Sequence, residues 1–269
     1  MDFEMLAGPP QTPVVIPDAV EDLINGRPFE VVWLNGLGGL TFRIRDTSSS
    51  VYVKWLPVAS EVDVAGEMKK LRWASAYTPV PTLVDHGSDS EGSWLVTEAI
   101  DAENAVAARW KREPKSATAA LGAGLRAFHD ALPKESCPYE WSAAQRLREI
   151  QRRVDDGSLD HHEWSESFSG LTLRTAMDEL RVIPDEDLVV CHGDACAPNT
   201  LMDERGKWVA HVDLENLGVG DRWADLAILT WSTVWNYGEG WEMNVYDSYG
   251  IEPELEKIRY YRLLWELEG

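Results

Sequence analysis

The feature that most constrains this chain is a short polar segment set between two apolar runs typical of strands. The segment has the form H-x-D-x-x-x-x-N and carries Asp194 and Asn199, directly after the apolar run at residues 189–191. A second strand-like run at residues 208–212 then leads into Asp213. A loop that follows one strand, beside the end of the next, can present three oxygen-bearing side chains into one cleft.

These side chains suit the transfer of a phosphoryl group, a reaction that depends on positioning and charge neutralisation more than on covalent chemistry. One carboxylate must orient the acceptor hydroxyl and take its proton. An amide oxygen and a second carboxylate must hold Mg²⁺ on the nucleotide phosphates, because Mg²⁺ prefers oxygen ligands. Asp194, Asn199 and Asp213 match the kinase catalytic loop and metal-binding aspartate in type and order. Each alone is more typical of a turn or a strand end, and the combination favours the site.

Composition excludes several classes of protein. The chain of 269 residues has 46 acidic and 25 basic residues and a formal net charge of −21, which disfavours binding to nucleic acid. The charge is consistent with a cationic ligand or with simple solubility. Three cysteines are too few for a disulfide scaffold and indicate a reducing compartment. The acidic start lacks the features of a signal peptide, and no apolar run approaches the roughly 20 residues that span a bilayer. We therefore expect a cytoplasmic protein with no membrane partner.

Hydrophobic periodicity predicts strands in the first part of the chain and helices in the second. Apart from a short helix at residues 18–25, the first 30 residues are expected to be irregular. Predicted strands lie at residues 40–45, 51–56, 82–85 and 94–98. Predicted helices lie at residues 60–76, 116–132, 143–154, 171–182, 224–235 and 254–267. This order predicts an α+β fold with a boundary near residues 97–103.

A lysine in the middle of an apolar strand gives a second signal. Lys54 is unfavourable there unless it is paired, and Glu67 lies at the edge of the buried face of the helix that follows. Their ion pair would aim Lys54 at nucleotide phosphates, whereas the alternative is an edge-strand lysine and a solvated glutamate. Tyr52 shares the face of Lys54 and either stacks on adenine or packs within the sheet. The glycine-rich residues 35–39 form either a loop over phosphates or a plain hairpin turn.

These residues resemble the aminoglycoside phosphotransferases, most closely the 3′-phosphotransferases of the kanamycin and neomycin type. The resemblance covers nearly the whole chain, and its most specific stretches are residues 191–199, 212–214 and 217–227. It implies a protein-kinase-like bilobal fold. The small β-rich lobe, residues 1–97, would bind the nucleotide. A hinge at residues 98–102 would join it to a larger, mainly helical lobe, residues 103–269, which would carry catalysis and substrate binding. It also implies transfer of the γ-phosphate of ATP or GTP to a hydroxyl of a cationic aminoglycoside, with Mg²⁺.

The resemblance also assigns roles to single residues. It makes Asp194 the residue that orients the acceptor hydroxyl, and Asn199 and Asp213 the Mg²⁺ ligands. Lys54 becomes the phosphate-binding lysine and Glu67 its partner. In the same comparison, Thr97, Glu98 and Ala99 form the hinge whose backbone binds adenine, and Asp225 braces the catalytic loop.

The acceptor side departs from the family pattern. Asn216 stands where the family commonly has arginine, and Trp235 and Asn236 fall where some members carry an acidic pair. Near the C-terminus Glu266 remains, but its partner is Trp265. These positions are the candidate substrate-binding residues. The departures leave open a kinase of the same fold that acts on another antibiotic, an aminocyclitol or a metabolite. A non-catalytic drug-binding protein is a further alternative.

Overall fold

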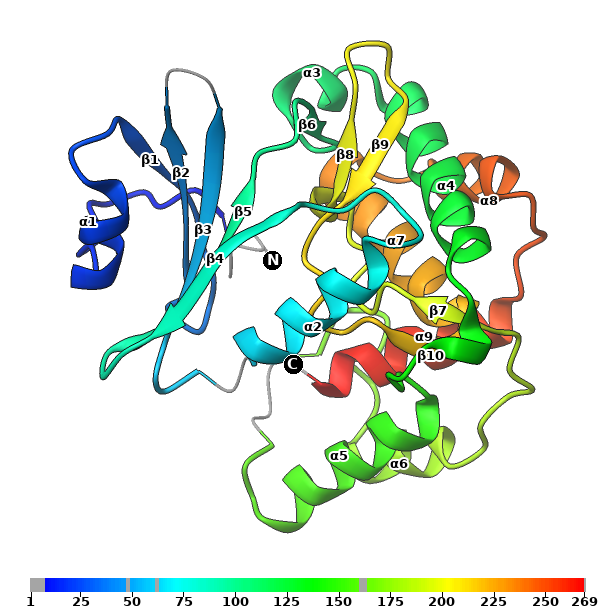
Figure 1. The fold of residues 1–269 in the computed structure, drawn as a ribbon. Helices are drawn as coiled ribbons and strands as arrows, with labels where there is room; N and C mark the ends of the chain where they lie inside the picture. The colour runs from blue at the N-terminus through cyan, green and yellow to red at the C-terminus, as the bar shows by residue number, and fades with distance from the viewer. Residues whose placement is uncertain (1–7, 47–48, 61–62, 160–163, 269) are drawn as a thin grey trace. The chain divides into compact units, whose positions relative to one another are not determined.

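The computed structural model describes residues 8–46, 49–60, 63–159 and 164–268 (Figure 1). The acidic first residues, which were expected not to form a signal peptide, lie outside these ranges. The chain divides into two compact units. The first contains residues 1–76 and 80–101, and the second contains residues 77–79 and 102–269.

The first unit is built on a five-stranded antiparallel sheet with the order β1-β2-β3-β5-β4 (Figure 1). Its strands are β1 (Phe29–Leu34), β2 (Leu40–Arg45), β3 (Ser50–Pro57), β4 (Leu83–Ser88) and β5 (Gly92–Glu98). In this register Lys54 lies at the centre of the sheet, opposite Thr41 on β2 and Leu95 on β5. The central position explains why the sequence around Lys54 is apolar.

The two faces of this sheet differ as the alternation in the sequence predicts. Helix α1 (Asp18–Ile24) packs through Val20 and Ile24 on a face that includes Phe42 and Val53. Tyr52 and Lys54 alternate with Val53 along β3, so they lie on the opposite face. One face is therefore a hydrophobic core, and the other carries the predicted nucleotide-binding side chains.

Helix α2 (Val64–Ala74) is shorter than the helix predicted at residues 60–76. The predicted start at Ser60 is wrong because Asp63 has extended backbone angles, φ −92° and ψ 90°, and occupies the position before the first helical residue. Residues 61–62 lie outside the described ranges. Val64, Met68 and Leu71 are buried, as their helical spacing predicts.

The glycine-rich segment forms the turn of the β1–β2 hairpin. Asn35 donates its backbone N–H to Gly39 O at 2.9 Å, and Gly38 donates to Asn35 O at 3.1 Å. The side chain of Asn35 also accepts the Gly39 N–H at 2.6 Å. The hairpin alternative is confirmed. The strand β1 that precedes this turn was not predicted.

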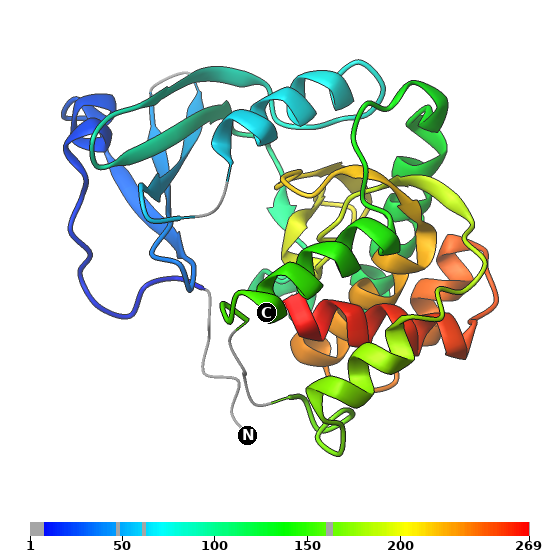
Figure 2. The same cartoon turned by 90° about the horizontal axis from the view of Figure 1, so that it is seen from below.

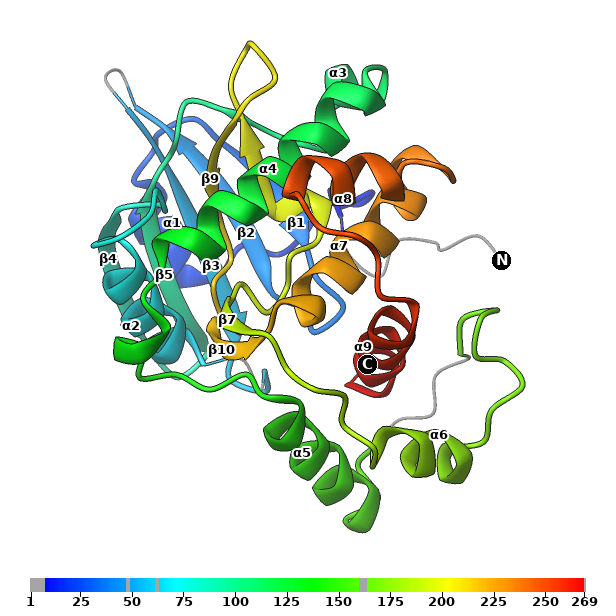
Figure 3. The same ribbon diagram turned by 90° about the vertical axis from the view of Figure 1, so that its right-hand side faces the viewer.

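The second unit is mainly helical. Its helices are α3 (Ala108–Lys111), α4 (Pro114–Ala131), α5 (Ala143–Asp155), α6 (Leu173–Leu180), α7 (Arg222–Tyr237), α8 (Glu242–Tyr249) and α9 (Leu255–Glu268). Helix α9 lies beside α5 (Figure 2), and it also packs against α6 and α7 (Figure 3). Trp223, Leu264 and Tyr261 are fully buried in the core that these helices share.

Local signals set the helix ends. Pro114 begins α4, where the missing N–H of proline has no helical partner to lose. Asp221 caps α7 by accepting the Trp223 N–H at 3.0 Å, and Gly238, with φ 84°, ends it. Helix α7 is therefore two residues longer at each end than the predicted residues 224–235. The other helices predicted in this unit, α4, α5, α6 and α9, agree with their predicted ranges to within two residues at each end, whereas α3 and α8 were not predicted.

Two small sheets complete the second unit. Strand β7 (Leu188–Cys191) pairs with β10 (Gly218–Asp221). Strand β8 (Thr200–Met202) pairs with β6 (Glu103–Asn104) on one side and with β9 (Trp208–His211) on the other. A sheet-based first unit and a helical second unit confirm the predicted α+β fold. In the part of the chain that is described, no helix is both long and apolar enough to cross a membrane.

Candidate active site

The polar segment predicted from the sequence is a loop held at both ends by strands. It leaves β7 after Cys191, passes through the short 3₁₀ helix η2 (Ala197–Asn199) and enters β8. The backbone N–H of Val212 donates to Asn199 O at 3.0 Å. This bond fixes the start of the Asp213 segment against the end of the loop, so Asp194, Asn199 and Asp213 belong to one local structure.

Asp194 and Asn199 contact each other directly. Asn199 Nδ2 donates to both the backbone oxygen and Oδ2 of Asp194, each at 3.0 Å. Within the described residues, Asp194 Oδ1 is buried and has no hydrogen-bond partner. A buried carboxylate oxygen without a donor is unfavourable unless a ligand supplies one. The loop therefore holds one oxygen of Asp194 in place and leaves the other for a hydroxyl group.

Asn199 and Asp213 offer oxygen atoms of the kind that a hard cation prefers. Because Asn199 donates through Nδ2, its Oδ1 is left to act as a ligand, and no described residue donates to that atom. Asp213 has φ 64°, a left-handed conformation that non-glycine residues seldom adopt. Such strain persists only where the surrounding structure imposes it, and it is common at functional sites.

Asp225 on α7 braces the loop, as the sequence predicts. Its Oδ2 accepts the N–H of His192 at 2.6 Å, and its Oδ1 accepts the N–H of Gly193 at 2.9 Å. His129 Nε2 lies 2.8 Å from the same Oδ2. Burial by itself raises the pKa of Asp225, but the side-chain hydrogen bond with His129 and the hydrogen bond from the Gly193 N–H outweigh burial and lower it. The carboxylate is thus ionised and fully hydrogen-bonded.

His192 supports the loop from within the protein. It is fully buried, and its Nδ1 accepts the N–H of Asp194 at 3.3 Å. Its Nε2 lies 3.0 Å from Val212 O, which can only accept a hydrogen bond. The two partners together assign the neutral ring with the proton on Nε2. His192 is therefore a structural support of the loop.

In the first unit, Lys54 and Glu67 form the predicted ion pair. Lys54 Nζ lies 2.9 Å from Glu67 Oε2, and the Glu67 side chain is 4% exposed. A buried glutamate paired in this way holds the lysine ammonium in one position. The pair therefore fixes a positive charge on the same face of β3 as Tyr52.

The predicted hinge residues begin at the end of β5, the strand that pairs with β3 beside Tyr52. Thr97 lies opposite Tyr52 in the β3–β5 register. The N–H groups of Glu98 and Ala99 donate to Thr82 O and Ser50 O, both at 2.9 Å. A purine that accepts from Ala99 would therefore compete with Ser50 for that donor.

The candidate acceptor residues have different surroundings in the second unit. Asn216 lies against the catalytic loop, since a Cβ on Gly193 would come within 2.3 Å of the Asn216 carbonyl oxygen. The rings of Trp235 on α7 and Trp265 on α9 have centroids 5.6 Å apart. Glu266 accepts a hydrogen bond from the backbone N–H of Ser165. The Glu266 carboxylate is thus already engaged within the protein.

Sequence reasoning missed two supports of the loop. Ser232 on α7 accepts the N–H of Ala197 at 3.0 Å, and Cys196 lies near enough to interact with both Ser232 and Asp194. Burial, together with the nearby Asp194 carboxylate, raises the pKa of the Cys196 thiol well above its ordinary value. A serine in a buried helix gives no local sign of this role, so only the fold reveals it.

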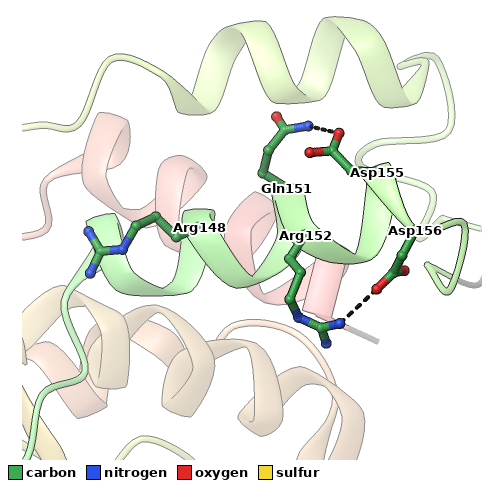
Figure 4. Close-up of a pocket in the computed structure, with 5 residues that line it drawn as sticks. All are labelled: Arg148, Gln151, Arg152, Asp155 and Asp156. Atoms are coloured by element: carbon green, nitrogen blue, oxygen red, sulfur yellow. Dashed lines mark hydrogen bonds and ion pairs between the residues drawn. The ribbon is translucent and has the colours of Figure 1, made fainter.

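A pocket on α5 lies apart from these residues (Figure 4). Polar side chains that line it form hydrogen bonds with one another, each between residues four apart in sequence. Gln151 donates to Asp155 at 2.8 Å, and Arg152 donates to Asp156 at 2.7 Å. None of the predicted site residues lines it. The pocket therefore has no part in the arrangement around Asp194.

The chain is similar to known phosphotransferases. A family model described as "Phosphotransferase enzyme family" matches residues 33–262. An aminoglycoside 3′-phosphotransferase of Streptomyces fradiae is 36% identical over 230 residues, which cover 80% of this chain and 85% of the relative. One from Escherichia coli is 29% identical over 209 residues, which cover 76% of each chain.

Solved structures show the same similarity. The crystal structure of an aminoglycoside-3′-phosphotransferase of type VIII is 32% identical, with a TM-score of 0.79, and the match covers 93% of this chain and 98% of that one. An aminoglycoside phosphotransferase of Streptomyces rimosus, in complex with ADP and streptomycin, shares the fold at 24% identity and a TM-score of 0.69, with 86% of this chain and 90% of that chain covered.

The fold and the loop thus define a phosphotransferase with a protein-kinase-like architecture. The chain belongs to the phosphotransferase enzyme family. It is an enzyme of the kinase type, and the resemblance drawn from its sequence is confirmed.

Proposed function

We propose that this enzyme transfers the γ-phosphate of ATP or GTP to the 3′-hydroxyl of a cationic aminoglycoside, which would give resistance to the drug. The proposal rests on the hydrogen bonding of the two carboxylate oxygens of Asp194. Asn199 holds its Oδ2, while Oδ1 is buried without a partner among the described residues. The relatives named as aminoglycoside 3′-phosphotransferases support this choice of acceptor.

In the proposed mechanism Asp194 Oδ1 accepts the hydrogen of the acceptor hydroxyl and takes its proton as the phosphoryl group arrives. The hydrogen bond from Asn199 prevents the carboxylate from rotating away. Asp225 keeps the loop in register by accepting the N–H groups of His192 and Gly193. The proposed role of Asp194 is therefore one of alignment, with proton transfer late in the reaction.

The residues present fit Mg²⁺ on the nucleotide phosphates. Asn199 Oδ1 and the Asp213 carboxylate supply hard oxygen ligands, and the bond from Val212 to Asn199 ties their segments together. When bound, the ion would neutralise charge on the phosphates. We assign these two residues as its ligands.

Nucleotide binding is proposed for the residues of the first unit. Lys54, held by Glu67, would neutralise the α- and β-phosphates, and Tyr52 on the same face would stack on adenine. Thr97, Glu98 and Ala99 would meet the purine edge. In this proposal residues 1–97 bind the nucleotide, residues 98–102 act as a hinge, and residues 103–269 carry catalysis and the acceptor site.

The cytoplasm is the proposed location, since ATP and GTP are available there. The three cysteines are free, which suits a reducing compartment. Resistance would follow because a phosphate adds negative charge to a drug that depends on its positive charge.

The test is a product screen by mass. Purified enzyme is incubated with Mg-ATP or Mg-GTP and a panel of aminoglycosides, and the products are weighed. We expect Asp194→Ala to lower turnover by about a thousandfold and to retain nucleotide binding, because a positioned base contributes about 10²–10⁴-fold. Asp247→Ala, an exposed carboxylate on α8, is the matched control and should leave turnover unchanged. Unchanged turnover in Asp194→Ala would remove the assigned role.

A second candidate is a kinase of the same family that acts on another hydroxylated amine. This candidate is favoured because the carboxylates near the C-terminus already have hydrogen-bond partners within the protein. Glu266 is bonded to Ser165, and Glu268 forms two hydrogen bonds with Arg146 at 2.7 and 2.6 Å. The same screen with aminocyclitols and other antibiotics separates the two, since only the preferred acceptor gains a phosphate.

A further inference from the structure

Three tryptophan side chains form a continuous aromatic cluster at the α7–α9 contact. The ring centroids of Trp231 and Trp235 are 5.2 Å apart, those of Trp235 and Trp265 are 5.6 Å apart, and those of Trp231 and Trp265 are 6.0 Å apart. Trp231 is buried at 8% exposure, while Trp235 keeps 37% of its surface exposed and Trp265 is half-buried. The cluster thus has an inner ring and two outer rings.

The cluster is attached to the catalytic loop through one face of α7. Ser232 holds the loop by accepting the Ala197 N–H at 3.0 Å, and Asn236 donates to the Ser232 backbone oxygen at 2.9 Å. Trp235 and Asn236 are three and four residues after Ser232, so they share its side of the helix. Trp235 therefore lies one helical turn from the point where α7 supports the loop of Asp194.

The inner ring already holds a cation. The Arg262 guanidinium lies 5.4 Å from the centroid of Trp231. Tryptophan gives the strongest cation–π attraction of the aromatic side chains. The carboxylates that follow on α9, by contrast, are engaged: Glu266 with Ser165 and Glu268 with Arg146. At this end of the unit, the tryptophan rings therefore offer a cation–π contact beside carboxylates that already have partners within the protein.

We propose that Trp235 and Trp265 form an aromatic wall of the acceptor site, on which an ammonium-bearing sugar ring of the substrate lies face to face. The proposal rests on the proposed function and names the substrate feature that this site selects. A sugar ring offers an apolar C–H face for stacking, and its ammonium group is attracted to the indole. The enzyme then selects its acceptor by ring shape and one well-placed amine, more than by the total number of charges.

The experiment measures steady-state kinetics for one aminoglycoside, kanamycin, in the wild type and two variants. We expect Trp235→Ala to raise the KM for kanamycin about tenfold, with kcat and the KM for ATP changed less than about threefold. Trp235→Phe keeps an aromatic face and should stay within about threefold of the wild type. A structural defect would change all three parameters together, so the split separates stacking from misfolding.

Controls distinguish failure of the wall from failure of the proposed function. Met243→Ala removes an exposed apolar side chain on α8 and should leave every parameter unchanged. An unchanged KM for kanamycin in Trp235→Ala would contradict stacking on Trp235 and leave the proposed function intact. An equal rise in this KM in Trp235→Phe would contradict it as well. No phosphorylation of any aminoglycoside by the wild type would overturn both.

Discussion

Asp225 shows how one buried carboxylate can organise a loop it does not belong to. Its two oxygens accept backbone N–H groups from His192 and Gly193, and His129 lies against one of them. These partners are 96 and about 33 residues away in sequence. The arrangement keeps the backbone of residues 192–194 fixed. A substitution there should therefore change both stability and turnover.

We expect Asp225→Asn to lower the free energy of unfolding at pH 7 by about 3 kcal/mol, because the new amide cannot accept from every donor that Asp225 satisfies. Turnover should fall as well, since the loop loses its brace. Urea unfolding and steady-state kinetics measure the two effects. Asp130→Asn is the control: Asp130 is exposed and pairs with Arg126 at 2.7 Å on α4, an interaction worth about 0.5 kcal/mol at most.

The same substitution gives a prediction for pH. Because the pKa of Asp225 is lowered in the folded state, its stabilisation is complete above the unfolded pKa of about 4. It is lost as the pH falls through the lower folded pKa. The difference in unfolding free energy between wild type and Asp225→Asn should thus be constant from pH 7 to about pH 5 and shrink below about pH 4. A difference that grows on acidification would contradict the assignment.

At the scale of elements, the packing of α4 against α8 depends on a glycine inside a helix. A Cβ on Gly122 would lie 2.3 Å from the carbonyl oxygen of Val245, a backbone atom that cannot move aside. Glycine normally weakens a helix by about 1 kcal/mol relative to alanine, so its presence here reflects close approach. The contact explains why α4 tolerates a residue with low helix propensity.

We expect Gly122→Ala to destabilise the protein by about 1–3 kcal/mol, because the clash exceeds the gain in helix propensity. Urea unfolding of the purified variant measures it. Gly170→Ala is the control, because a Cβ there has no neighbour within 4 Å, and its effect should stay within about 0.5 kcal/mol. A Gly122→Ala protein as stable as the wild type would mean that the two helices can separate at little cost.

Elements with a clear period were predictable, and elements without one were not. The long helices were found from their apolar stripes. Strand β1 was missed because a bulge between Val31 and Trp33 breaks its alternation. Strand β10 has only four residues, two of them glycine, which disfavour strands. Gly218 is needed there because its backbone lies against Glu140, where a Cβ would come within 2.6 Å.

At the scale of the whole molecule, the charge of −21 acts on stability as well as on ligand choice. Like charges repel in the compact state, and salt reduces that repulsion. The screening length falls from about 30 Å at 0.01 M salt to about 10 Å at 0.1 M. The folded protein should therefore be more stable at moderate salt than at low salt.

We expect the thermal midpoint at pH 7 to rise by a few degrees between about 10 and 300 mM NaCl, measured by calorimetry. The same salt series near the isoelectric point of 4.6 is the control, since net repulsion is absent there and the shift should vanish. A midpoint that falls with salt at pH 7 would show that attractive ion pairs outweigh the repulsion.

The α+β fold class, the loop of Asp194 and Asn199, and the pairing of Lys54 with Glu67 could all be predicted from the amino-acid sequence. Those features depend on local periods and short spacings, which a chain carries whatever its partners are. Three other features emerge only from the folded chain: Asp225 meets His129, Glu266 binds Ser165, and three tryptophans meet on α7 and α9. Their partners are far apart in sequence, 101 residues for Glu266 and Ser165, and packing selects which distant group satisfies a buried one.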